Sequence, residues 1–488
     1  MHPPGFAMPP TPKHRHHAEH ANATRLSLLW SGVRDSLWFI PALSTAGAIL
    51  LALLIVRLDA RWEAGGALGG ILFSGGADGA RGVLSAVAGS LITVTGVVFS
   101  VTVVALQLAS SQFTPRVLRG FMADRSNQIV LGIFIGTFTY SVMVLRTVTA
   151  GDDEGAAFVP EVGVTLAILL VLVSIAALIY FIDHAARSIQ VGVILARETE
   201  HTMHRVEQLF PSQIGEEETD TAADAPGAPA ATVLAARSGY LLAVHGQGLF
   251  ELSDVGRMTI RMEPPIGAFV LEGEPLASVW PVSAVTDEVI EAVREAFLLG
   301  EERTPEQDVE LGITVIADMA VRALSPGIND PTTAQLSIDR LAEILARIGR
   351  VPEPVPARIG PDGAVRLLAR ITTFERAVEI AFGQIRHYGG DNPAILARLL
   401  DSYERLGALV LPGRREVLVR EAERTLERGR LAGLPPGARQ ALERRGAGCL
   451  EALRQPSARS TAPLATTVAT GERSRAAPAL THPSDRSA

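Results

Sequence analysis

Lysine is almost missing from this chain: Lys13 is the only lysine among its 44 basic residues, and all the others are arginines. Phosphate-binding loops of the G-x-x-x-x-G-K-[ST] type, Schiff-base catalysis, Ser-x-x-Lys acylation and the attachment of biotin or lipoate each require a lysine. The folded part of the chain therefore excludes these chemistries. Cys449 is likewise the only cysteine, which excludes an intramolecular disulfide and a Cys-x-x-Cys metal knuckle.

Positive charge is also in deficit, since the 488 residues carry 44 Lys and Arg against 52 Asp and Glu, a formal net charge of −8. This balance gives no reason to expect nucleic acid as a partner. No residues have the spacing of a nucleophile with its base, of a metal site or of a nucleotide loop. We therefore expect the chain not to be an enzyme and to use no cofactor or metal.

Apolar residues, by contrast, make up 48% of the chain and concentrate before residue 185. Four stretches there, 36–56, 82–115, 126–145 and 162–182, contain no charged residue. As helices rising about 1.5 Å per residue, each can cross a hydrocarbon core of about 30 Å. The sequence thus predicts transmembrane helices at about 36–56, 82–110, 127–147 and 162–183, with the lipid bilayer as a partner.

The basic residues in the short flanks predict the orientation of these helices. Lysine and arginine recur in the segment 13–34 and in the loop 116–125, whereas the loop 147–161 carries acidic residues only. By the positive-inside rule, both termini are expected in the cytoplasm.

The second span differs from the others in its length and in the placement of its polar residues. At about 100° per residue, nine residues fall in one stripe about 80° wide, and all of them except Val103 are small or polar. The small or polar members of this stripe are Ser85, Gly89, Thr93, Gly96, Ser100, Gln107, Ser111 and Thr114.

Two interpretations of the stripe are open. Gly, Ser and Thr let helices approach closely, and their hydroxyls hydrogen-bond across a helix pair for about 1 kcal/mol. Alternatively, identical subunits around an axis would place the stripe along a hydrated path, where Gln107 and the hydroxyls offer ligands to an ion. The spans carry no acidic or basic residue in their interiors, which argues against a proton-coupled pump.

Periodicity and composition divide the whole chain as follows. The fold class predicted is a membrane all-α part of four transmembrane helices followed by a mixed α+β, mainly helical cytoplasmic domain. The segments are a disordered tail (1–22), a membrane domain (23–184) that begins with an interfacial helix (24–35), a helical extension (185–210), a linker (211–232), a small β-rich subdomain (233–282), a helical domain (283–454) and a disordered tail (455–488).

Within the β-rich subdomain, Gly267, Val270, Gly273 and Leu276 follow a pattern that resembles half of a biotinyl or lipoyl barrel. Because no lysine is available for modification, we expect a small β structure without chemistry of its own.

A helix start and a polar corner follow in the helical domain. The sequence Thr-Pro-Glu-Gln at 304–307 predicts Thr304 as the N-cap of a buried helix that runs to about Leu324. In the corner that follows, Asp330 is expected to cap the next helix, with Pro331 at its first position. A polar corner between two buried helices must satisfy its own hydrogen bonds, so it is a candidate site as well as a structural turn.

Four segments carry a resemblance: SSQFTPRVLRGF (110–121), FIDH (181–184), ERTPEQDVELG (302–312) and ALSPGINDPTTA (323–334). In this order they resemble the bacterial predicted membrane protein family known as domain of unknown function twenty-two fifty-four, over roughly residues 25–430. The resemblance implies a multi-pass protein of the bacterial inner membrane and no established activity. It also implies that the following are family motif positions: Gln112, Thr114, Pro115 and Arg116 after the second span, and Arg322, Ser325, Pro326, Asn329, Asp330 and Pro331 in the corner.

We expect the two groups of motif residues to meet on the cytoplasmic side and to couple the soluble domain to the second span, for example through Asp330 and either Arg116 or Arg119. The function predicted is a homo-oligomeric, channel-like pore for ions or small solutes with a cytoplasmic regulatory domain. The alternative is a membrane-anchored sensor or interaction module without transport activity. The length and the single stripe of the second span favour the channel, because a plain anchor needs neither.

Overall fold

A computed structural model describes residues 36–61, 72–112, 124–150, 158–209, 231–305 and 307–455. The predictions for the two tails, for the interfacial helix and for most of the linker lie outside these residues. Thr114, Pro115 and Arg116 also lie outside them, as do the side chains of Ser111 and Gln112.

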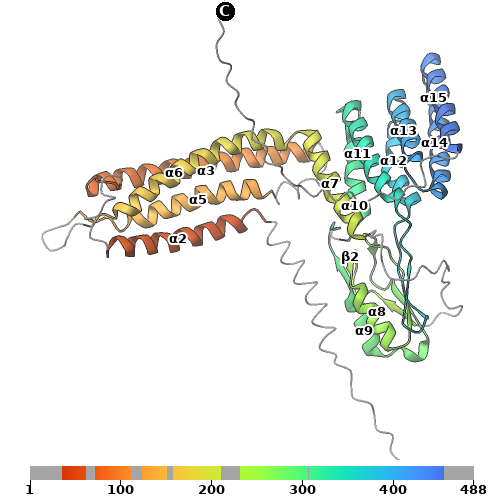
Figure 1. Cartoon of the computed structure of the whole chain (residues 1–488), viewed down its shortest axis with the longest axis horizontal. Helices are drawn as coiled ribbons and strands as arrows, with labels where there is room; N and C mark the ends of the chain where they lie inside the picture. Colours follow the sequence, from red (N-terminus) through yellow and green to blue (C-terminus); the bar gives the residue numbers. More distant parts are fainter. Residues whose placement is uncertain are drawn as a thin grey trace, which may run out of the picture.

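Four apolar helices lie side by side at one end of the molecule (Figure 1), and each is long and apolar enough to cross a membrane. This confirms the four predicted spans. The second, with 36 residues, is about 54 Å long and therefore exceeds a hydrocarbon core of about 30 Å. The helices are α2 (Phe39–Asp59), α3 (Ala77–Gln112), α5 (Arg125–Leu145) and α6 (Glu161–Ser188).

Helix α5 is the central helix of the four. In its most apolar 18-residue stretch, 56% of the residues are buried, against 17% in the corresponding stretches of α2 and α3 and 28% in that of α6. Small residues bring α5 close to α2: a Cβ added at Gly132 would lie 2.6 Å from Ser44 Oγ, and one at Gly136 would touch the Ser44 backbone. Close helix packing through glycine therefore occurs on α5.

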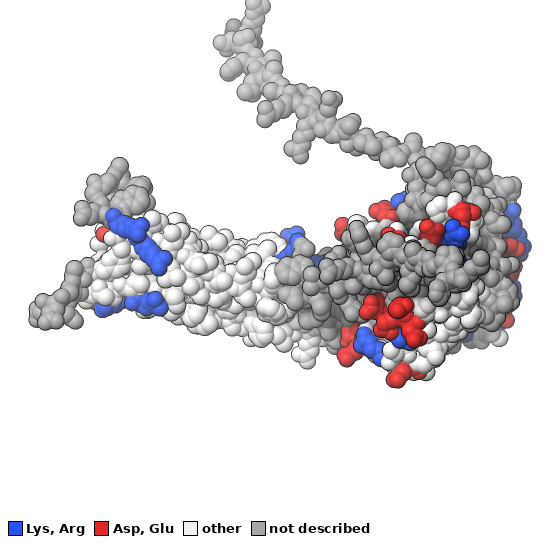
Figure 2. Space-filling view, turned by 90° about the horizontal axis from the view of Figure 1, so that it is seen from below, with Lys and Arg blue, Asp and Glu red and all other residues white. Residues whose placement is uncertain are grey.

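Hydrogen bonds connect the helices to one another at the end of the bundle that is remote from the C-terminal domain. Asp59, at the end of α2, accepts from the backbone N–H groups of Val162 (3.2 Å) and Gly163 (2.9 Å), and so caps the start of α6. Arg81 donates to the carbonyl oxygen of Val148 at 3.1 Å. Figure 2 shows basic groups at this end, while the visible flank of the bundle is largely uncharged.

The chain leaves the bundle through a break at Ile189 and Gln190, after which α7 (Val191–Leu209) turns away (Figure 1). The predicted extension after the fourth span is therefore helical, but α7 is a separate helix and does not continue α6. The physical reason is packing, because the apolar face of α7, with Ile194, Leu195 and Val206, is buried in the core of the C-terminal domain.

That core joins α7 to six further helices. Residue Asp308, whose carboxylate accepts from Leu311 N, caps the first of them, so the prediction that Thr304 is the N-cap was wrong. In the middle of the core the rings of Phe382 and Tyr403 meet edge to face with centroids 5.5 Å apart. The helices are α10 (Val309–Ala323), α11 (Pro331–Arg350), α12 (Phe374–Tyr388), α13 (Pro393–Gly407), α14 (Arg415–Leu431) and α15 (Pro436–Arg454).

The β-rich subdomain has a five-stranded sheet of order β1-β5-β3-β8-β7 and a three-stranded sheet of order β4-β2-β6, with α8 (Gly246–Val255) and α9 (Asp287–Ala296) against them. It extends past the predicted boundary at 282, because β6 follows α9, and β7 and β8 arrive from between α11 and α12. A short hairpin of β7 and β8 needs the edge of an existing sheet, which the parallel pairing of β8 with β3 provides. The strands are β1 (Ala231–Leu234), β2 (Gly239–Val244), β3 (Thr259–Met262), β4 (Phe269–Val270), β5 (Pro275–Trp280), β6 (Phe297–Gly300), β7 (Ala357–Ile359) and β8 (Val365–Leu368).

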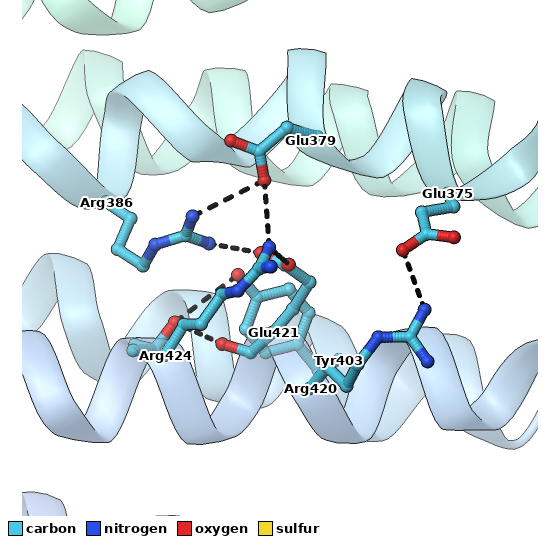
Figure 3. Close-up of polar contacts among 8 residues, drawn as sticks. Glu375, Glu379, Arg386, Tyr403, Arg420, Glu421 and Arg424 are labelled. Carbon is cyan, nitrogen blue, oxygen red and sulfur yellow. Dashed lines mark hydrogen bonds and ion pairs between the residues drawn. The ribbon is translucent and has the colours of Figure 1, made fainter.

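Ion pairs between helices join α12 to α14 (Figure 3). Arg386 of α12 pairs with Glu421 of α14, whose side chain is only 5% exposed. Arg424 lies 2.6 Å from the same carboxylate and 3.4 Å from Glu379. Charged residues of α12 and α14 thus pair across the helix interface, because the two helices lie next to each other.

We predict that Glu421→Gln lowers the free energy of unfolding by about 1.5–3 kcal/mol, because it removes the charge of the buried partner of Arg386 and leaves only Glu379, at 3.5 Å, to balance that guanidinium. The matched control is Glu375→Gln, which breaks the pair of Glu375 with Arg420, where the two side chains are 61% and 43% exposed. This exposed pair is expected to contribute about 0–1 kcal/mol. Thermal unfolding in mild detergent measures both variants, and equal losses would contradict the prediction.

Candidate functional site

The candidate site is the joint between the membrane helices and the C-terminal domain, and Asp124 lies at its centre. Its carboxylate caps α5 by accepting from Ser126 N at 2.9 Å. The same carboxylate lies 3.0 Å from His184 Nε2 on α6 and 3.3 Å from a guanidinium nitrogen of Arg197 on α7. Asp124 therefore ties two membrane helices to the first helix of the C-terminal domain.

The position of Asp124 explains why a carboxylate is tolerated there although its side chain is only 6% exposed. The N-terminus of α5 presents the positive end of its dipole, and Arg197 supplies a full positive charge. The ring of His184 stacks on Tyr180, whose hydroxyl donates to Ser126 Oγ at 3.0 Å. FIDH (181–184) is recognisable as a motif in the sequence, whereas Asp124 and Arg197 carry no such signal, because their partners lie far away in sequence.

Apolar contacts reinforce this joint. Leu106, near the end of α3, packs against the core of the C-terminal domain, as do Ile189 and Val191 at the break between α6 and α7. The long helix α3 thus contacts the C-terminal domain directly.

The next contact along the chain is a close approach of α7 and α10. A Cβ added at Gly312 would lie 2.1 Å from Thr202 Oγ1 and 2.9 Å from Thr202 Cγ2. Only glycine fits at this crossing without moving α7. The glycine belongs to the motif segment 302–312, and its role becomes clear only from the packing.

The same segment connects α10 to the β-rich subdomain. Arg303 binds the Asp308 carboxylate through two hydrogen bonds of 2.8 and 2.9 Å, and Gln307 Oε1 accepts from Val244 N on β2 at 3.0 Å. Burial raises the pKa of Asp308, and the Arg303 guanidinium partly offsets that rise. Gly267, with φ +83°, allows this approach, because a Cβ there would lie 2.3 Å from an Asp308 carboxylate oxygen.

The polar corner between α10 and α11 satisfies its hydrogen bonds internally, as the sequence predicts. Asn329, in the left-handed region with φ 49°, donates from its backbone N–H to Ser325 O at 2.9 Å, and Asp330 N donates to Ala323 O at 2.8 Å. Asp330 caps α11 by accepting from Thr333 N (3.1 Å) and Thr333 Oγ1 (2.5 Å), with Pro331 in the first turn. Both of its carboxylate oxygens are thus used in the cap, while the suggested partners Arg116 and Arg119 lie outside the described residues.

An open cavity of about 850 Å³ adjoins the corner. Corner residues Arg322, Ser325, Pro326 and Asn329 line one side, and the turn between α12 and α13, including Tyr388, lines the other. The lining mixes hydrogen-bonding groups with an exposed aromatic ring, which suits a small polar ligand or a peptide segment. The described residues hold no group of three or more His, Cys, Asp or Glu able to bind a metal.

The polar stripe of α3 lies away from the other membrane helices. Its members with described side chains are all exposed, and a Cβ added at Gly89 or Gly96 would meet nothing within 4 Å. The buried face, with Leu84, Leu91 and Val98, lies roughly 150° round the helix from the centre of the stripe. Among the residues that the structure describes, no other helix packs against the described part of the stripe. These members are Ser85, Gly89, Thr93, Gly96, Ser100 and Gln107.

We predict that Asp124→Asn loosens the joint, because asparagine retains the N-cap but loses the charge that holds His184 and Arg197. Hydrogen exchange of peptides covering 185–205 should become about tenfold faster in intact protein. Asp183→Asn is the matched control, since Asp183 is a neighbouring acid that is 60% exposed and pairs with exposed Arg187. Equal exchange in the wild type and Asp124→Asn would contradict a holding role.

The Asp330 carboxylate in the corner predicts that the stability of the protein depends on pH. Hydrogen bonds from the Thr333 hydroxyl and N–H lower the pKa of Asp330 below its ordinary value of 3.8. The stabilisation from this carboxylate is therefore present above pH 3.8 and is lost as the pH falls through the lower, folded-state pKa. Asp330→Asn should remove this pH-dependent part of the free energy of unfolding. Asp330→Ala should remove it as well, and should also lower the free energy of unfolding at neutral pH by about 1 kcal/mol. Unfolding of the three proteins at several pH values tests it, and identical pH dependence in all of them would count against the assignment.

Comparison with known proteins identifies the family. The family model described as "Predicted membrane protein (DUF2254)" matches residues 34–405. Uncharacterized proteins of Mycobacterium bovis and Mycobacterium tuberculosis are each 33% identical over 468 residues, covering 90% of this chain and 88% of their own. No solved structure matches. The match spans the four membrane helices, the joint at Asp124 and the polar corner, and the chain belongs to the DUF2254 family of predicted membrane proteins.

Proposed function

We propose that this membrane protein assembles into a homo-oligomer in the bacterial inner membrane and forms a channel for ions or small solutes. In this proposal α3 lines the path, both termini lie in the cytoplasm, and the C-terminal domain regulates opening. The observation that carries the proposal is the outward-facing polar stripe of α3.

The stripe supports the proposal because the described residues of the chain leave it uncovered. Most of its residues are small, so several copies of α3 can approach one axis closely. Thr93 and Ser100 donate their hydroxyls to the carbonyl oxygens of Gly89 (3.0 Å) and Gly96 (2.9 Å), which leaves hydroxyl lone pairs available to a passing ion. Large apolar side chains flank the stripe, including Val97, Phe99 and Val104, and suit lipid or a neighbouring subunit.

The joint supports a regulatory role for the C-terminal domain. Leu106 on α3 contacts the core of that domain, and Asp124 connects α5 and α6 to α7. A rigid movement of α7 would therefore be transmitted to α5 and α6, and through Leu106 to α3, which carries the stripe.

A membrane-anchored sensor or interaction module without transport is the second candidate. The open cavity at the corner favours it, since a ligand site in the C-terminal domain is useful with or without a pore. Measurement of flux separates the two.

We predict ion flux through wild-type protein in proteoliposomes, and loss of most of it in Ser100→Trp, because an indole on the stripe would fill a narrow path. Gln107→Leu should change the rate or the ion preference, because it removes a ligand group. Val101→Trp is the matched control: it adds the same ring at the same depth, but about 100° away from Ser100 on the helix.

The oligomeric state should also be measured in mild detergent, because the four membrane helices of one chain enclose no useful pore. A monomer, or no flux under any voltage, pH or ionic condition, would eliminate the channel. Flux that is equal in Ser100→Trp and Val101→Trp would remove α3 as the lining helix.

A further inference from the structure

A second open cavity, of about 740 Å³, lies in the C-terminal domain between α11, α13 and Met203 of α7. We call it the arginine groove, because five arginines and only two acidic residues line it. The arginines are Arg340, Arg347, Arg350, Arg398 and Arg405.

The positive charge of the arginine groove is not fully balanced. Asp339 pairs with Arg398 and lies 3.6 Å from Arg405, and Glu343 lies 2.8 Å from Arg340. Glu207 on α7, outside the lining, is 3.4 Å from Arg347. Three carboxylates thus face five guanidiniums, in a chain whose formal net charge is −8.

The arginine groove also has a hydrogen-bond donor that the described residues leave unused. The Nε of Arg398 is buried and has no hydrogen-bond partner among the described residues. Arg405 remains 67% exposed, and Arg350 is exposed at the end of α11. Planar guanidiniums that converge on an open groove match the geometry of phosphate oxygens, and in a chain with a single lysine, arginine is the residue left to supply this contact.

The groove has an apolar side as well. Leu336 on α11 and Leu409 after α13 are each 44% exposed although they are large hydrophobic residues, and both line the groove together with Leu406. A ligand with an anionic end and an apolar end would cover both kinds of surface.

We propose that the arginine groove binds a phosphate-bearing ligand with an apolar portion. Such a group can come from a soluble phosphorylated compound or from an anionic phospholipid headgroup. This binding does not depend on transport activity, so it holds or fails separately from the channel.

The test is isothermal titration of the full chain, reconstituted in phosphatidylcholine nanodiscs, with four probes. Pyrophosphate and adenosine triphosphate represent the soluble source. Dihexanoyl-phosphatidylglycerol represents the headgroup, and dihexanoyl-phosphatidylcholine, which has no net charge, is its control.

The variant is the double substitution Arg350→Gln and Arg405→Gln, which removes two charges at the solvent edge of the groove. It should weaken binding by about tenfold or more, since charged hydrogen bonds are lost. The matched control is Arg420→Gln with Arg454→Gln, which removes two charges from exposed ion pairs on α14 and α15 and should leave affinity unchanged.

Binding of either soluble probe, reduced in the groove variant and retained in the control, supports the proposal and assigns the soluble source. Binding of phosphatidylglycerol alone, with the same dependence on the variant, supports it and assigns the headgroup. The proposal is overturned if no phosphate probe binds at millimolar concentration, or if binding is equal in the groove variant and the control.

Discussion

The buried carboxylate of Asp124 connects the membrane helices to the C-terminal domain of this protein. It lies where α5 enters the bundle, and its partners come from α6 and α7. A buried carboxylate is costly unless donors surround it, so the helix dipole, His184 and Arg197 must all be in place. This requirement determines how the C-terminal domain is held against the bundle, together with the apolar contacts of Leu106, Ile189 and Val191.

From this joint, α10 connects the remaining parts. Gly312 of α10 allows α7 to approach closely. The N-cap residue of α10, Asp308, holds Arg303 beside Gly267 of the β-rich subdomain. The polar corner at the end of α10 leads into α11. Three of the four motif segments in the family resemblance therefore have structural roles at or near this chain of contacts. The fourth, residues 110–121, begins where α3 ends, and its side chains lie outside the described residues.

The two surfaces on which the proposals rest have different physical characters. The stripe of α3 consists mostly of small and polar residues that the described part of the chain leaves uncovered, which is the basis of the proposed assembly with further copies. The arginine groove is concave and basic in a chain that is acidic overall, which suggests an anionic ligand. If both proposals hold, a phosphate-bearing ligand in the C-terminal domain would lie on the same helix, α11, that begins at the polar corner and packs against α7.

Local pattern was sufficient for the parts of this protein that depend on local physics. Long uncharged runs specify membrane helices, because backbone N–H and C=O groups in hydrocarbon must hydrogen-bond within their own segment. Asp330 followed by Pro331 specifies a helix start, because both residues act within one helical turn. The contacts that join these parts have no such signature. Asp124 and Arg197 are 73 positions apart, Gly312 meets Thr202 across two helices, and β8 completes a sheet begun more than a hundred residues earlier. The stripe could be read from the sequence, but whether it faced α5 or the outside followed only from the packing of the whole bundle, because helical periodicity defines a face and not its neighbour.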